Sequence, residues 1–156
     1  MKTNHIKIEI EKLSNLIFDD VVSYRKWIHK HPELSFQEEK TSEYICSILK
    51  KNNIKFLNNI AGHGIVATIE GKKPKSRIIG FRADMDALPI REENEVDYKS
   101  INQGLMHACG HDVHSSILLG VAIIVNKLKE NLFGTIKFIF QPAEEKLPGG
   151  ASLMIK

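Results

Sequence analysis

The chain has 156 residues, which is enough for one domain with a buried core. Its composition of 42% hydrophobic, 26% charged and 7% aromatic residues is that of an ordinary soluble protein, and it excludes fibrous, disordered and disulfide-scaffolded classes. The formal net charge is +3, but Lys and Arg alternate with Glu and Asp along the chain instead of clustering. We therefore expect no nucleic-acid partner, since a phosphate-binding stripe needs basic residues on one face.

The cysteines and the apolar segments indicate the compartment. Cys46 and Cys109 lie far apart in sequence and form no disulfide framework, which favours a reducing environment. Residues 1–12 alternate Ile with charged residues and contain no apolar signal segment, and no apolar run approaches the ~20 residues that cross a bilayer. We expect a cytoplasmic protein with no membrane partner.

The first part of the chain predicts two helices. Residues 14–30 carry apolar side chains at helical spacing, and Pro32 stops that pattern. Ser35 then offers a helix N-cap, with Glu38 three residues later as the partner in a capping box. The helix that follows is expected to end at Asn52 and Asn53.

The remainder predicts strands that alternate with one helix and one loop. The short turn at residues 71–75 suits a hairpin or a tight connection between the first two of these strands. In chain order we predict strands at 64–70 and 76–82, a surface loop at 92–105, a helix at 113–129, and a strand at 135–140 that Pro142 ends.

Helices alternating with apolar strands predict an α/β fold with a mixed sheet flanked by helices. In such sheets the chemistry gathers at the carboxyl ends of the strands. Residues 82–86 and 141–145 each leave a strand end, and residues 106–112 form a loop that runs into a helix. We therefore expect these three polar clusters to converge on one edge of the sheet.

A cluster of metal-ligating residue types lies in the third of these segments. His107, His111 and His114 fall in one short window with Cys109, and thiolate and imidazole are typical ligands of zinc and similar divalent ions. In Cys109-Gly110-His111 a glycine separates two ligands and allows a tight backbone path. The alternative is a buried cysteine beside a solvated, histidine-rich loop.

Two adjacent carboxylates, Glu144 and Glu145, follow the last predicted strand. The preceding Ile-Phe-Gln-Pro-Ala should bury them, and buried like charges need a positive partner. One glutamate can then bind metal while its neighbour takes a proton from the attacking water. The alternative is a solvated acidic pair in a surface loop.

Asp84 and Asp86 stand at the end of an earlier strand, and we expect at most one of them to face the metals directly. We favour Asp86 as a carboxylate that orients a metal ligand or the water held by the metals. An aspartate that caps a turn is the alternative. His114, three residues after His111, could be a ligand, a partner of a ligand or a substrate contact.

Four motifs in this order carry a family resemblance: His31-Pro-Glu-Leu-Ser-Phe-Gln-Glu38, Arg82-Ala-Asp-Met-Asp-Ala-Leu-Pro89, Met106-His-Ala-Cys-Gly-His-Asp112 and Gln141-Pro-Ala-Glu-Glu145. The chain resembles the amidohydrolase branch of the aminoacylase/carboxypeptidase-like metallopeptidases, which includes hippurate hydrolases, N-acyl-amino-acid amidohydrolases and auxin-conjugate hydrolases. The resemblance implies metal-dependent hydrolysis of N-acyl amino acids. It also implies a site for two divalent ions, zinc or manganese first, with cobalt or nickel as further options.

The resemblance also implies roles for individual residues. Cys109 matches a ligand that bridges the two metals, His111 matches a terminal ligand, and Glu145 matches a ligand of the second metal. Glu144 matches the catalytic base, and Asp86 matches an aspartate that supports the ligands.

Asp84 stands where peptidase cousins carry a metal-binding histidine, a difference that is usual for the amidohydrolase branch.

Similar proteins are longer than this chain. By resemblance, residues 1–156 are the N-terminal portion of a three-layer, zinc-exopeptidase-like catalytic domain that is incomplete, without the dimerisation domain and the C-terminal part. Full-length relatives of this type are expected to be homodimers. The alternatives to a truncated hydrolase are an inactive metal-binding fragment or interaction module, and a purely structural Cys/His metal site.

Overall fold

The computed structural model describes residues 2–156, and the side chains from residue 4 onward. It contains α-helices, strands and two short 3-10 turns, η1 (Pro74–Ser76) and η2 (Lys129–Asn131). The helices are α1 (Lys2–Lys30), α2 (Glu39–Lys51), α3 (His111–Lys127) and α4 (Gly150–Met154), and the strands are β1 (Lys55–Ile60), β2 (Gly64–Glu70), β3 (Ile78–Asp84) and β4 (Thr135–Gln141).

The four strands form one sheet in the order β1-β2-β4-β3. Strand β4 is antiparallel to β2 and parallel to β3, so the sheet is mixed, as predicted. A hairpin between β2 and β3 is wrong, because β4 lies between them. Their connection instead crosses the start of β4, where the Gly71 amide donates to the Gly134 carbonyl at 2.9 Å and the Thr135 amide donates to the Arg77 carbonyl at 2.8 Å.

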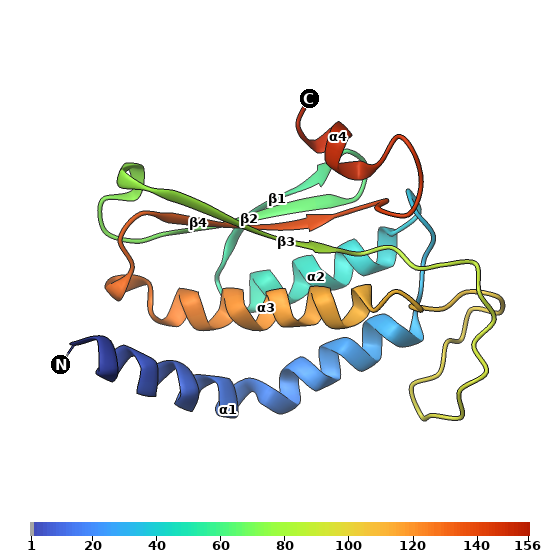
Figure 1. Cartoon of the computed structure of the whole chain (residues 1–156), viewed down its shortest axis with the longest axis horizontal. Helices are drawn as coiled ribbons and strands as arrows, with labels where there is room; N and C mark the ends of the chain where they lie inside the picture. Colours follow the sequence, from blue (N-terminus) through green and yellow to red (C-terminus); the bar gives the residue numbers. More distant parts are fainter. Residues whose placement is uncertain (1) are drawn as a thin grey trace.

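The long helices lie on one face of the sheet, with α2 and α3 against the strands and α1 packed beneath α3 (Figure 1). Phe138 and Phe140 of β4 are fully buried at the centre of this core. Burial of a large apolar side chain stabilises a fold by about 1.5–3 kcal/mol, so these layers hold the site's framework rigid. At the α1–α3 crossing, a Cβ on Gly120 would come within 2.9 Å of Val21, so only glycine permits the close approach.

Two predicted helix starts are wrong. Helix α1 begins at Lys2, well before residue 14. Helix α2 begins at Glu39, and neither Ser35 nor Glu38 caps it with a side chain. The Glu33 carboxylate satisfies that helix end instead, accepting the amides of Lys40 and Thr41 at 3.1 and 2.8 Å.

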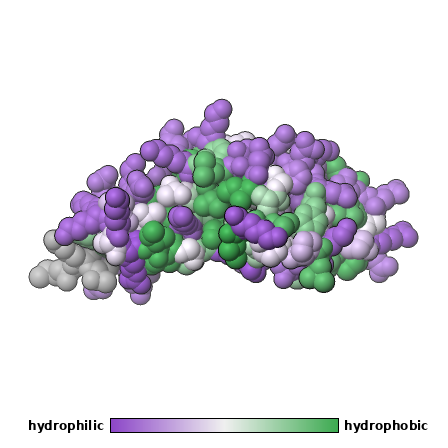
Figure 2. Space-filling view, turned by 90° about the horizontal axis from the view of Figure 1, so that it is seen from above, coloured by the Kyte–Doolittle hydropathy of each residue, from purple (hydrophilic) through white to green (hydrophobic). Residues whose placement is uncertain are grey.

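The opposite face of the sheet is largely uncovered. Figure 2 looks onto that side and shows hydrophobic side chains gathered in its middle, with polar ones around them. By the alternation of side chains along the strands, Leu57, Val66, Ile78 and Ile139 share this face. Leu57 is 69% exposed and Ile78 is 63% exposed. Strand β3 is an edge strand within the described part of the chain.

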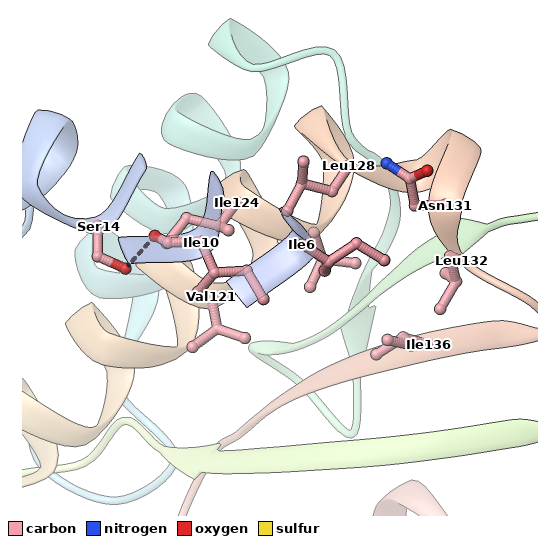
Figure 3. A pocket seen from close by; sticks show the side chains of 10 residues that line it. Ile6, Ile10, Ser14, Val121, Ile124, Leu128, Asn131, Leu132 and Ile136 are labelled. Atoms are coloured by element: carbon pink, nitrogen blue, oxygen red, sulfur yellow. Dashed lines mark hydrogen bonds between the residues drawn. The ribbon is translucent and has the colours of Figure 1, made fainter. Parts of the chain in front are cut away.

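An apolar cavity of about 320 Å³ lies between α1 and the C-terminal half of α3. Figure 3 shows Ile6 and Ile10 of α1 facing Val121, Ile124 and other apolar side chains. This cavity is remote from the three polar clusters, which lie at the opposite end of α3. Among the described residues, no helix combines the length and apolarity required to cross a membrane.

Candidate metal centre

The three polar clusters meet at one edge of the sheet. Because β3 and β4 are parallel neighbours, Asp84 pairs with Gln141 at their carboxyl ends. The pairing extends one residue further, since the Met85 amide donates to the Gln141 carbonyl at 3.0 Å. Helix α3 starts with His111 at the same end of the molecule (Figure 1). The topology thus brings three segments that are distant in sequence into one site.

Cys109, His111 and Glu145 form a cluster at this edge. Each offers one ligand atom, and these atoms all lie within 4.8 Å of one another. His111 is buried, whereas Cys109 and Glu145 are exposed, so the cluster opens to solvent on one side. Sulfur, nitrogen and oxygen donors at this spacing suit a borderline divalent cation.

Asp86 links two members of the cluster. His111 Nδ1 donates to the Asp86 carbonyl at 2.9 Å and lies 3.2 Å from Asp86 Oδ1. Asp86 Oδ2 accepts the backbone amide of Glu145 at 3.0 Å. Because Nδ1 is engaged with Asp86, the other ring nitrogen, Nε2, is the one available to a cation.

The ionisation of these groups follows from their contacts. Burial alone would raise the pKa of Asp86, but hydrogen bonds from His111, Ser35 and the Glu145 and Glu144 amides outweigh burial and hold this pKa well below its usual range. Burial would lower the pKa of His111, but the contacts with Asp86 outweigh it and raise the pKa to about 9.

The cluster therefore holds protons that a cation could displace. A hydrogen bond to the Glu145 carboxylate raises the pKa of the Cys109 thiol. The imidazolium of His111 likewise carries a proton at neutral pH that a cation would have to replace. A negatively charged Asp86 behind His111 is the arrangement that strengthens an imidazole ligand, so these residues fit a divalent metal.

The expectation that Glu144 and Glu145 are buried is wrong, because both are exposed. Pro142 and Ala143 are buried, but Ala143 adopts a left-handed backbone with φ of 49°. This turn directs the following pair outward, so water solvates the two like charges. Glu144 lies directly beside Glu145 in sequence, and its negative charge contributes to the raised pKa of the Cys109 thiol.

Asp84 and His114 lie beside the cluster but outside it. Asp84 is 3% exposed, and its Oδ1 lies 3.3 Å from Arg82 Nε. His114 Nδ1 lies 3.4 Å from Asp84 Oδ2, and the rings of His114 and His111 are 6.5 Å apart at their centroids. Neither side chain belongs to the group of three possible ligands.

A buried charged network next to the site was not predicted. His29 is 3% exposed and faces two carboxylates, with Nδ1 at 2.8 Å from Asp112 and Nε2 at 3.0 Å from Glu92. Arg25 Nε donates to the same Asp112 oxygen at 2.8 Å. Because Asp112 follows His111 directly, the network anchors the first turn of α3. Glu92, expected in a surface loop, is buried because it faces His29 and accepts the Ser100 amide.

His107 is the histidine of the Cys/His window that the cluster does not use. It is 4% exposed, and neither ring nitrogen has a hydrogen-bond partner among the described residues. Burial lowers its pKa to about 4, so the ring is neutral at pH 7. The sequence signal for His107 was its place in that window, but sequence could not separate a buried ring from a ligand.

The sequence of this chain is similar to those of known hydrolases. Residues 80–156 match the model of peptidase family M20/M25/M40. An N-acyl-L-amino acid amidohydrolase from Geobacillus stearothermophilus is 45% identical over 96% of this chain and 40% of its own length. An N-acetylcysteine deacetylase from Bacillus subtilis is 40% identical over 86% of this chain and 35% of its own length. The chain thus spans 40% and 35% of the length of these two relatives.

Solved structures give the same result. The B. subtilis YXEP protein, a dinuclear metal binding peptidase from the M20 family, superposes with a TM-score of 0.80 at 40% identity, over 86% of this chain and 38% of its own. A protein from methicillin-resistant Staphylococcus aureus reaches a TM-score of 0.85 at 39% identity, over 94% of this chain and 38% of its own. The matching motifs, the mixed sheet and these relatives together show that the chain is similar to members of peptidase family M20/M25/M40, whose model matches residues 80–156, just under half of the chain.

Proposed function

We propose that this chain contributes Cys109, His111 and Glu145 as metal ligands and Glu144 as general base to the hydrolysis of N-acyl amino acids. The observation that carries the proposal is the convergence of three ligand atoms within 4.8 Å, backed by Asp86, which contacts both His111 and the Glu145 amide. The relatives named as an N-acyl-L-amino acid amidohydrolase and an N-acetylcysteine deacetylase support the substrate class.

In the proposed reaction, the bound cations would supply positive charge and Glu144 would transfer the proton. When bound, divalent cations would polarise the amide carbonyl and make water nucleophilic at neutral pH. Glu144 would take one proton from the attacking water while the water oxygen bonds to the acyl carbon. Glu144 would then deliver that proton to the amide nitrogen as the C–N bond breaks, which releases a carboxylate and a free amino acid.

Asp86 would serve catalysis by orienting the ligands. It fixes the imidazole of His111 through Nδ1 and holds the Glu145 backbone through Oδ2. A ligand whose direction is already fixed loses less entropy on binding a cation. The cation preference that we propose is zinc or manganese, because the donor set mixes sulfur, nitrogen and oxygen.

We also propose that residues 1–156 form the N-terminal portion of a catalytic domain. Support comes from the share of the relatives that the chain spans and from the uncovered apolar sheet face. Large apolar side chains that share one exposed sheet face, as Leu57 and Ile78 do, suit a surface for further packing.

The test is an amide-hydrolysis assay on the purified chain with added Mn²⁺ or Zn²⁺, using hippurate and N-acetyl amino acids as substrates. The matched control is Glu144→Gln, which keeps the shape of the side chain but removes its basicity. We expect turnover that depends on metal and is lost in the control. Metal binding without turnover would contradict the hydrolytic role for this chain and favour an inactive metal-binding fragment. Metal-dependent folding that ignores Glu144 and Glu145 would favour a structural site.

A further inference from the structure

Two polar side chains from the segment between α1 and α2 contact residues next to the metal cluster. Ser35 is 7% exposed and Glu38 is fully buried, although both lie in a connection where polar groups normally face water. The α2 N-terminus does not use either side chain, since Glu33 accepts the helix amides there. Both are therefore free to make long-range contacts.

Ser35 supports the carboxylate behind the ligands. Its hydroxyl donates to Asp86 Oδ2 at 2.6 Å, and the same oxygen accepts the Glu145 amide at 3.0 Å. Asp86 thus receives bonds from three separate segments, since His111 contacts its other side. Without the hydroxyl, a buried carboxylate would lose its shortest hydrogen bond and with it a fixed orientation.

Glu38 supports the loop that carries the glutamate pair. Its Oε1 accepts the Ala143 amide at 2.6 Å, and Ala143 is the left-handed residue that turns the chain toward Glu144 and Glu145. The left-handed conformation is unfavourable for a residue with a Cβ, so something must hold it. A buried acceptor on its amide meets that need.

Glu38 remains in an environment that disfavours its charge. Burial raises the pKa of Glu38, although hydrogen bonds from the amides of Ala143, Glu38 and Phe36 oppose that rise. Its second oxygen, Oε2, has no hydrogen-bond partner among the described residues. An apolar side chain would fill the same space without the desolvation cost of a buried carboxylate. Packing alone therefore does not account for Glu38 at this position.

We propose that Ser35 and Glu38 are positioning residues of the metal centre, Ser35 by orienting Asp86 and Glu38 by fixing the Ala143 turn that presents Glu145. The inference rests on the proposed metal-binding function of Cys109, His111 and Glu145. It assigns the 33–38 segment a role in setting the geometry of ligands that lie on two other loops.

The experiment is a titration of the metal-free chain with Co²⁺, followed through the absorbance of the cobalt–thiolate bond and the ligand-field bands. The test variants are Ser35→Ala, which deletes one hydroxyl, and Glu38→Met, which keeps volume but deletes the acceptor. The rescue variant is Glu38→Gln, which retains an acceptor for the Ala143 amide. The structural control is Glu33→Gln, which weakens the α2 cap in the same segment and has no contact with the cluster.

We expect Ser35→Ala and Glu38→Met to weaken Co²⁺ binding by about 10–100-fold, the range typical of residues that orient metal ligands, with altered ligand-field bands. Glu38→Gln and Glu33→Gln should bind within about threefold of the parent, as expected for variants that leave the ligand-orienting bonds intact. Parental affinity and spectra in both test variants would overturn the inference, as would an equal loss in Glu33→Gln. If Glu38→Met does not fold, Ser35→Ala decides alone. No Co²⁺ binding by the parent would overturn the proposed metal function together with this inference, whereas binding with unchanged variants would overturn the inference alone.

Discussion

Replacement of Asp86 by Asn tests how far one buried carboxylate organises the cluster. The substitution keeps the shape of the side chain but removes its negative charge, which faces His111 at 3.2 Å and accepts bonds from Ser35 and the Glu145 amide. Residues that orient metal ligands typically contribute 10–100-fold to metal affinity, or about 1.4–2.7 kcal/mol. Because Asp86 contacts two ligand residues, we expect a loss toward the upper end of that range.

The assay is calorimetric titration of Zn²⁺ into the metal-free chain at fixed pH. Asp84→Asn is the matched control, since Asp84 is equally buried but its carboxylate contacts Arg82 and His114 instead of the three ligands. We expect Asp84→Asn to change the affinity less than about threefold, well below the effect of an orienting residue. Equal affinities for Asp86→Asn and the parent would refute the reasoning, and so would a larger loss in the control.

Two further predictions concern the metal-free chain. The raised pKa of His111, about 9 against an ordinary 6.5, means that its contact with Asp86 stabilises the fold fully below pH 6.5 and is lost as pH rises through about 9. The free energy of unfolding, measured by urea titration with a chelator present, should therefore fall between pH 6.5 and 9.5 by roughly 3 kcal/mol at most, and a flat profile would contradict the contact. His29→Ala should destabilise the chain by about 3–5 kcal/mol, because Asp112 and Glu92 would lose a buried partner; an unchanged urea midpoint would show that the network is not coupled to stability.

Individual strands could be predicted from the sequence because each one is encoded by neighbouring apolar residues and by the turn residues that bound it. The strand predicted at 64–70 matches β2, and the strand predicted at 135–140 differs from β4 by one residue. The order of the strands could not be read in the same way. Insertion of β4 between β2 and β3 depends on contacts between residues that are far apart in sequence, and no turn motif reports it.

The candidate site shows the same division. The proximity of Cys109, His111 and Glu145 followed from the rule that strand carboxyl ends share an edge, together with the chemistry of the residue types. The roles of Ser35 and Glu38 did not follow, because Ser-x-x-Glu has the pattern of a capping box whether or not it caps a helix. Only tertiary contacts show whether such side chains cap a helix or form hydrogen bonds to a loop that is distant in sequence.

The most direct test of the central claim is an anomalous-scattering crystal structure of the chain grown with Zn²⁺. We predict zinc at this cluster, either as one ion held by all three residues or as two ions that share Cys109, with Cys109 Sγ at about 2.3 Å and His111 Nε2 and a Glu145 oxygen each at about 2.0–2.2 Å from a zinc ion. Zinc that leaves any one of Cys109, His111 and Glu145 without a bond to it, or that lies elsewhere on the chain, would contradict the proposed metal centre.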